Sequence, residues 1–173
     1  MNRKFASRLV LLVAALILSN IVQAATDSFS VNALAGIARV EIAVTGIHRD
    51  FARYGLDGDE LRRRVAARLA AYGLPVVPAP VVGTDAQAGQ LAIKLVTNKV
   101  QYAFYHYAVS VTLNRRVRVD PGNQAYVALA AWSEGRHGIL NPSDLNAVYD
   151  YVDALLSRFI AAHGNDNAAP PTS

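Results

Sequence analysis

The sequence predicts an α+β fold, a two-layer sandwich in which two amphipathic helices cover one face of an antiparallel sheet of about four strands. Three observations support this prediction. Several segments alternate apolar and polar residues with a period of two, two segments carry apolar residues at helical spacing, and the predicted order is β-α-(β)-β-β-β-α. With 173 residues, the chain is long enough for one domain with a substantial core.

The N-terminus is typical of a secretory signal peptide spanning residues 1–24. Residues 1–8 carry three basic side chains, Leu9–Leu18 is unbroken and apolar, and Val22 and Ala24 occupy the small-residue positions before a cleavage site. The apolar run is well short of the roughly 20 residues that span a bilayer. We therefore expect cleavage after Ala24, no transmembrane segment afterwards, a flexible lead-in over 25–37, one domain over 38–164 and a disordered tail over 165–173.

Charge and cysteine content restrict the function. The chain has 17 Lys+Arg and 13 Asp+Glu, and three of the basic residues belong to the expected signal peptide, which leaves 14 against 13 in the mature chain. A nucleic-acid-binding domain needs a larger basic excess, so we expect no nucleic-acid partner. The absence of cysteine excludes lipidation and disulfides. We expect a periplasmic protein, with secretion as the alternative.

The first half of the domain predicts a strand and then a helix. Val40, Ile42 and Val44 alternate with polar residues up to Gly46, as in a half-buried strand. Asp57, with Glu60 three residues later, resembles a capping box, and Gly73 is a natural helix end. The apolar face of this helix is formed by Leu61, Val65, Leu69 and Tyr72.

The middle of the chain predicts a proline-limited edge and a long hairpin. Pro75, Pro78 and Pro80 restrict the valine pairs beside them to short edge pieces or loop. A second strand follows around 91–96, and we expect the chain to reverse at Asn98 and Lys99. Residues 102–119 and 124–134 then predict two antiparallel strands joined by a turn at 120–123.

The last element is an amphipathic helix over 141–164. Asn141 is the expected cap, Pro142 suits the first turn, and Gly164 is the expected end. One face carries a continuous apolar stripe made of Leu145, Val148, Tyr149, Val152, Leu155, Leu156, Phe159 and Ile160.

The sequence contains little that predicts catalysis. Ser133 and Glu134 are neighbours in a predicted strand and so face opposite sides, and His137 follows in a glycine-flanked stretch expected to be a loop. The four histidines have no zinc-binding spacing. Asp57, Asp59 and Glu60 lie where acids cap a helix. We expect no enzyme activity, no metal and no cofactor.

The candidate binding residues lie in and beside the predicted hairpin. Aromatic and arginine side chains are common at protein interfaces and at sugar sites. In the segment 102–119, residues at even positions such as His106 and Arg116 are expected on a solvated sheet face, joined by Lys94, and Trp132 is expected on one face with Tyr126, Ala128 and Ala130. The candidates are Tyr102, Phe104, Tyr105, His106, Arg116, Arg118 and Trp132.

The layout resembles small periplasmic accessory proteins of the bacterial envelope. The segments that carry the resemblance are "ARVEIAVTGI", "YHYAVSVTLNRRVRV", "AYVALAAWSEG" and the final helix. Similar layouts occur in the lipopolysaccharide-assembly lipoprotein and in the N-terminal domain of the Tol–Pal β-propeller protein, although this chain lacks the lipid-attachment cysteine. The resemblance implies a non-catalytic binding or assembly protein with an envelope protein partner. The alternatives are a carrier of an apolar or glycan ligand and, third, a hydrolase or metal-dependent enzyme.

Overall fold

The computed structural model describes residues 32–78, 85–100, 104–118 and 126–168; within these, the side chains of Asp50, Val117, Arg118, Tyr126 and Val127 are not described. Leu34–Ser173 forms one compact unit, and the account below concerns this unit alone. The expected signal peptide, the turn at 120–123 and the end of the expected tail lie outside the described residues.

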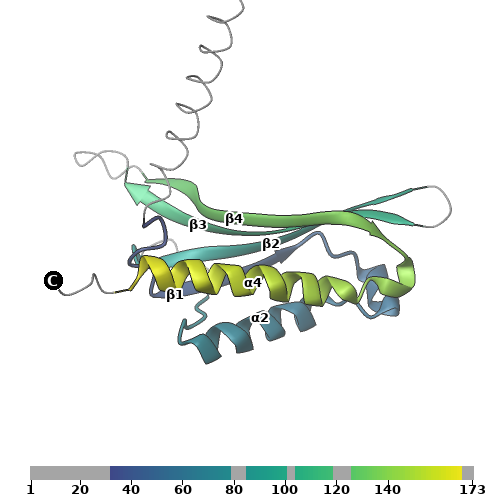
Figure 1. Cartoon of the computed structure of the whole chain (residues 1–173), viewed down its shortest axis with the longest axis horizontal. Coiled ribbons are helices and arrows are strands. Elements are labelled where there is room, and N and C mark those ends of the chain that lie inside the picture. Colours follow the sequence, from purple (N-terminus) through teal and green to yellow (C-terminus); the bar gives the residue numbers. More distant parts are fainter. Residues whose placement is uncertain (1–31, 79–84, 101–103, 119–125, 169–173) are drawn as a thin grey trace, which may run out of the picture. The chain divides into compact units, whose positions relative to one another are not determined.

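The α+β sandwich predicted from the sequence is confirmed. A four-stranded sheet has the order β1-β2-β3-β4, and helices α2 and α4 lie together on one of its faces (Figure 1). The elements are β1 (Arg39–Thr45), η1 (Arg49–Tyr54), α2 (Gly58–Tyr72), β2 (Ala88–Lys99), β3 (Tyr105–Arg118), β4 (Tyr126–Leu140), η3 (Pro142–Asp144) and α4 (Ala147–Asp166).

The sheet is mixed, whereas the sequence predicted an antiparallel one. β1 pairs parallel with β2, from Arg39 opposite Ala88 to Thr45 opposite Lys94, while the other two pairs are antiparallel. The reason is the connection between β1 and β2. It contains α2, and a helical crossover returns the chain to the end of the sheet at which the first strand began.

The proline-rich segment after α2 covers the outer edge of β1. Val40 N–H donates to the carbonyl of Pro75 at 3.0 Å, and Val77 N–H donates to the carbonyl of Val40 at 2.8 Å. Val76 forms an isolated parallel bridge with Val40. The prediction of a short edge piece at Val76 and Val77 is therefore confirmed, and this piece pairs with the outer edge of β1 at Val40.

Both long strands extend further than the sequence predicted. β2 continues to Lys99, so the expected reversal at Asn98 and Lys99 is wrong. β4 continues to Leu140, through the stretch that was expected to be a loop. The glycines in that stretch serve close packing: a Cβ at Gly138 would lie 3.1 Å from Tyr107 Cε1, and one at Gly135 would lie 3.0 Å from the carbonyl oxygen of Val109.

A bulge in β4 changes which face its side chains occupy. Leu113 pairs with Trp132, but the next residue of β3, Asn114, pairs with Ala130, which leaves Ala131 unpaired. A single extra residue reverses the alternation of side chains. Trp132 therefore faces the helices while Ala130 faces the other side, and the prediction that they share a face is wrong.

The core lies between the sheet and the two helices. The predicted helix faces are confirmed for the most part: Leu61, Val65 and Leu69 of α2 are buried, as are all but Ile160 of the stripe predicted for the last helix, but Tyr72 of the predicted α2 face is 38% exposed. In β3 the odd positions from Tyr107 to Leu113 are at most 2% exposed, so the predicted alternation holds. Each fully buried aliphatic side chain contributes roughly 1.5–3 kcal/mol by the hydrophobic effect.

The two helices begin differently from one another. Asp57 caps α2, because its Oδ1 accepts a hydrogen bond from Glu60 N–H at 2.8 Å, as predicted. Asn141 and Pro142 do not begin α4. Pro142–Asp144 forms the short turn η3 and α4 begins at Ala147, so the predicted start of the last helix is five residues too early. Asn141 bonds the side chain of Asp144 instead, at 3.3 Å.

The ends of the unit are fastened to each other, beyond the expected boundaries of 38 and 164. Leu34 and Ile37 are buried in the core. Leu34 N–H donates to Asp166 Oδ2 and Gly36 N–H donates to Asn167 Oδ1, both at 2.9 Å. The described fold thus includes residues from both the expected lead-in and the expected tail.

Candidate functional site

The face of the sheet opposite the helices, called here the open face, is built mostly from small and polar residues. Strand register places Ala43, Ala92, Thr112 and Ser133 in one row across the four strands. The next row contains Lys94, opposite Ser110, which confirms the expectation that Lys94 lies on this face. Short side chains over the centre give a flat surface whose polar groups contact one another, as Thr112 and Ser133 do at 2.8 Å.

One end of the open face is apolar. The exposed fractions are 66% for Ile139, 45% for Val100, 43% for Val96 and 39% for Phe104, and these four are a majority of the exposed large hydrophobic residues in the described part of the chain. Register brings them together: Ile139 is opposite His106, and Val96 is in a row with Ala108 and His137. We call these six residues the hairpin patch: Val96, Val100, Phe104, His106, His137 and Ile139.

The sequence produces this patch by continuing the alternation of β2 and β3 beyond the end of β1. β1 stops opposite Lys94, so Val96 and the residues after it have no β1 neighbour. Val100 N–H donates to the carbonyl of Phe104 at 2.8 Å, and this hydrogen bond continues the pairing of the two strands past Lys99 and Tyr105. Tyr105 points to the helix side, where its ring meets Phe51 edge-on at 5.5 Å, so Phe104 is directed to the open face.

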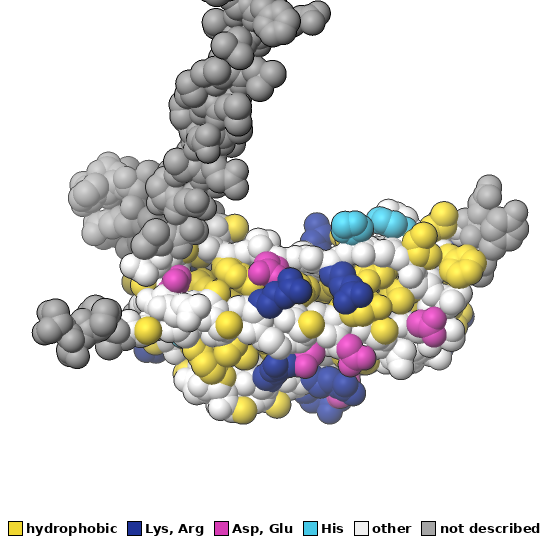
Figure 2. Space-filling view, viewed as in Figure 1, with side chains coloured by type: hydrophobic (Ala, Val, Ile, Leu, Met, Phe, Trp, Pro, Cys, Tyr) yellow, Lys and Arg dark blue, Asp and Glu magenta, His cyan; other side chains and the backbone are white. Residues whose placement is uncertain are grey.

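Figure 2 shows histidine side chains beside hydrophobic side chains near the end of the unit at which β2 turns into β3. His106 and His137 are both exposed. An apolar group rimmed by polar and titratable side chains is typical of an interaction surface, because a monomeric protein rarely leaves several large apolar side chains together in water.

The predicted site residues do not form a single site. Phe104 and His106 belong to the hairpin patch, whereas Arg116 lies ten residues further along β3, roughly 33 Å away at about 3.3 Å per residue. Trp132 contacts Phe159 of α4 at 5.4 Å between ring centroids, and Tyr105 packs on Phe51. Tyr102 lies outside the described residues, and Arg118 is in β3 without a described side chain.

Sequence reasoning missed Val96, Val100, His137 and Ile139. The signal for the two valines was present, because they continue the even positions that begin with Ala92 and Lys94. His137 and Ile139 were hidden by the interpretation of Gly135 and Gly138 as a turn. Arg115 lies on the face of β3 opposite to that of Asn114 and Arg116, where it is half-buried and donates to the carbonyl of Ala35 at 3.3 Å.

Aromatic side chains between the sheet and α4 are packed against one another. Tyr107 is 2% exposed and stacks on Tyr151 with centroids 5.4 Å apart and planes 8° apart, and Arg136 lies over the other ring of this pair at 4.1 Å. Burial, followed by a hydrogen bond to Tyr151, raises the pKa of the Tyr107 hydroxyl. These contacts fill the space between α4 and the sheet around Tyr107 and Trp132.

A groove of about 510 Å³ lies between α2 and α4, with Leu61 and Leu156 among its lining residues. Its charged side chains already bind partners of this chain. Arg68 pairs with Asp153 and donates to Ser157 Oγ at 2.7 Å. Arg64 donates to Glu60 Oε1 at 2.7 Å, and its guanidinium lies 4.3 Å from the ring centroid of Tyr149. These contacts link α2 to α4, so the groove is part of the packing between the two helices.

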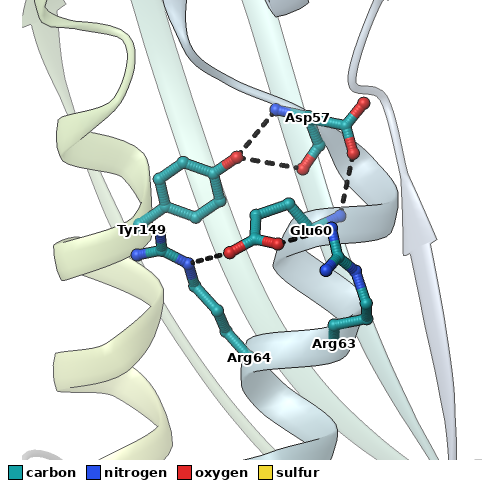
Figure 3. Close-up of polar contacts among 5 residues, drawn as sticks. All are labelled: Asp57, Glu60, Arg63, Arg64 and Tyr149. Carbon is teal, nitrogen blue, oxygen red and sulfur yellow. Dashed lines mark hydrogen bonds and ion pairs between the residues drawn. The ribbon is translucent and has the colours of Figure 1, made fainter.

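Glu60, in the first turn of α2, is the centre of a polar cluster (Figure 3). One of its oxygens binds Arg64, and the other binds Arg63 at 2.6 Å. The hydrogen bond from Arg64 lowers the pKa of Glu60, helped by the charges of both arginines. Of the three acids expected to cap α2, Asp57 caps the helix, whereas Asp59 and Glu60 form ion pairs with arginines one turn later.

Neither a serine hydrolase pair nor a metal cluster is formed by the residues considered for them. Ser133 and His137 share the open face but are separated by four residues of extended strand, about 13 Å. His163 is buried between the carbonyl of Ile37 at 2.8 Å and the hydroxyl of Tyr72 at 3.1 Å. Within the described ranges, no three His, Cys, Asp or Glu side chains are close enough to hold a metal ion.

Comparison with known proteins finds similarity to solved structures. No protein-family model matches the chain, and no curated protein matches it. The crystal structure of a minor lipoprotein from Acinetobacter baumannii superposes with a TM-score of 0.36 at 10% sequence identity, over 75% of this chain and 94% of that one. In the described part of the chain, no helix is long and apolar enough to cross a membrane.

Proposed function

We propose that this chain is an exported, non-catalytic accessory protein of the bacterial envelope, and that it acts by binding a protein partner through the hairpin patch. The observation that supports the proposal is the gathering of Val96, Val100, Phe104 and Ile139 at one end of a sheet face that is otherwise small and polar. Large apolar side chains on a surface cost free energy in water, and a partner that covers them recovers it.

The same observation selects protein contacts over a carried ligand. A ligand carrier needs a concave site that surrounds most of its ligand. The hairpin patch is on the outside of a sheet, and Tyr107 and Trp132, which would line a pocket below it, pack against Tyr151 and Phe159. These contacts favour a protein partner over a carried ligand, and the experiment below also detects bound lipid or glycan.

The test is a crosslinking pull-down of the full chain from its own envelope fraction, with mass spectrometry of proteins, lipids and glycans. The patch variant carries Phe104→Ser and Ile139→Ser. The control carries Val76→Ser and Leu129→Ser, which remove two exposed apolar side chains from outside the patch. Circular dichroism of both variants establishes that they fold.

A protein partner bound at least tenfold less by the patch variant, and bound normally by the control, supports the proposal. Equal retention by both variants overturns it, as does co-purification of lipid or glycan in place of protein. Export is tested separately by N-terminal sequencing of the chain recovered from the periplasm, for which we expect a start at Ala25.

A further inference from the structure

The two edges of the sheet are treated differently by the fold. The outer edge of β1 is paired at Val40 with Pro75–Val77, whereas β4 is the last strand of the sheet and pairs only with β3 among the described residues. β4 is 15 residues long. An open strand of that length presents a row of backbone N–H and C=O groups to any other strand that fits beside it.

After the bulge at Ala131, the side chains of β4 are arranged symmetrically about Gly135. Glu134 and Arg136 flank the glycine on the helix face, and Ser133 and His137 flank it on the open face. Two antiparallel copies of this strand that meet at Gly135 bring each acidic side chain opposite a basic one. A sequence with this property is complementary to itself.

We propose that β4 pairs with β4 of a second copy of this chain, antiparallel and about a two-fold axis at Gly135, to give a continuous eight-stranded sheet. In this register Glu134 lies opposite the partner's Arg136, and Arg136 lies opposite the partner's Glu134. Opposite charges placed directly across two strands stabilise the pairing, and a two-fold axis forms each contact twice.

The charged pair is held in place before the second copy arrives. Glu134 Oε2 binds Arg158 of α4 at 2.8 Å, and the Arg136 guanidinium lies 4.1 Å from the ring centroid of Tyr151, also in α4. Both side chains are thus anchored to the helix layer beside the open edge. Holding side chains in position in the monomer reduces the entropy that association has to remove.

The small residues of β4 leave room for the second strand. Gly135 has no side chain at the axis, and Trp132 lies opposite the partner's Gly138 in this register. The hairpin patch is on the open face and stays exposed in the pair, so this inference does not rest on the proposed function. A dimer presents two patches on the same side of one sheet.

Because the chain contains no cysteine, introduced cysteines test the register directly. The full chain is prepared as Ser133→Cys and, separately, as His137→Cys, and each is oxidised alone and in an equal mixture. These positions are opposite each other in the proposed pair, at a cross-strand Cβ separation of about 4.5–5.5 Å, close to what a disulfide needs. Ala67→Cys, at an exposed position of α2, measures random collision.

We expect the mixture to give at least ten times more disulfide-linked dimer than either variant alone or the Ala67→Cys control. Equal yields from all samples overturn the proposal. A high yield from Ser133→Cys alone overturns the register, because that residue is opposite itself only when the axis lies at Ser133.

The charges provide a second test by sedimentation of the uncrosslinked chain. Glu134→Arg and Arg136→Glu are each expected to weaken dimerisation at least tenfold, and the double swap is expected to return it to within about threefold, because the opposite pairs are then restored. Arg158→Ala is the control: it releases Glu134 from the helix but leaves the edge charges unchanged, so it is expected to weaken dimerisation less than either charge reversal does. Wild-type chain that stays monomeric at several hundred micromolar overturns the proposal.

Discussion

The hydroxyl of Tyr149 satisfies both backbone groups of one residue, Asp57. It accepts a hydrogen bond from Asp57 N–H at 2.8 Å and donates one to the Asp57 carbonyl at 3.2 Å, and so fixes the start of α2 to α4 (Figure 3). We predict that Tyr149→Phe lowers the free energy of unfolding by about 1–2 kcal/mol, because two partly buried polar groups lose their partner. Urea denaturation measures this loss.

Asp57→Ala is the informative companion variant. It removes the side-chain cap of α2 but leaves the backbone groups that Tyr149 binds, and we expect it to cost about 1 kcal/mol. Because Tyr149 is hydrogen-bonded directly to Asp57, the two losses are expected to be coupled, and the loss in the double variant is expected to differ from their sum by at least about 0.5 kcal/mol. Losses that add without this difference contradict the coupling.

Glu60 predicts how stability changes in acid. Hydrogen bonding by Arg64 and the charges of both neighbouring arginines lower its pKa in the folded chain below the ordinary 4.5. The stability it contributes is therefore present above about pH 4.5 and is lost as pH falls through the lowered pKa. We predict that Glu60→Gln is less stable than wild type at pH 7 and that the difference shrinks on acidification.

Thermal unfolding of both proteins between pH 7 and pH 2.5 measures this difference. Arg64→Gln serves as the control for the pair: it is expected to lower stability less in the Glu60→Gln background than in wild type, because the charged partner of Arg64 is gone and only its contact with the Tyr149 ring remains to be lost. A constant gap between wild type and Glu60→Gln over the whole range contradicts the lowered pKa.

Alternation and helical spacing were sufficient to predict the layers of this fold. The stripe from Val148 to Phe159 and the odd positions of β3 from Tyr107 to Leu113 are buried as expected, because burial of apolar area outweighs local preferences in such segments. Strand direction was not predictable in the same way. Nothing in the alternation of β1 distinguishes a parallel from an antiparallel partner, and the outcome depends on where α2 delivers the chain.

Glycine caused the main errors in the candidate site. Gly135 and Gly138 in a polar stretch predict a turn from local propensity, but in the fold they provide space for the carbonyl of Val109 and the ring of Tyr107. That tertiary reason extends β4 by six residues beyond Glu134 and brings Ile139 and His137 to the hairpin patch. The bulge at Ala131 places Trp132 on the helix face, and no residue type in this segment predicts a bulge.

Tyr107 predicts a loss of stability in alkali. Burial and its hydrogen bond to Tyr151 raise the pKa of the hydroxyl above the ordinary 10.0, more than Arg136 lowers it. The folded chain then holds this proton more tightly than the unfolded chain does, so stability falls as pH rises above about 10. We predict a shallower alkaline fall for Tyr107→Phe, measured by circular dichroism between pH 8 and pH 12. A parallel fall in both proteins contradicts the assignment to Tyr107.

The close approach of Gly46 to β2 predicts one of the least tolerated substitutions in the described fold. Gly46 has φ +83°, and a Cβ there would lie 1.8 Å from the carbonyl oxygen of Leu95, which cannot move without disturbing the ladder between β2 and β3. Gly36 is the matched control, because its φ is +75° but its Cβ would meet nothing within 4 Å.

The left-handed backbone alone costs an alanine about 1–2 kcal/mol, and that is the loss expected for Gly36→Ala. For Gly46→Ala we expect more than about 4 kcal/mol, or no folded protein, because the backbone clash is added to the same conformational cost. Urea denaturation of the two variants isolates the clash as their difference. Equal losses would show that the chain moves Gly46 away from Leu95 at little cost.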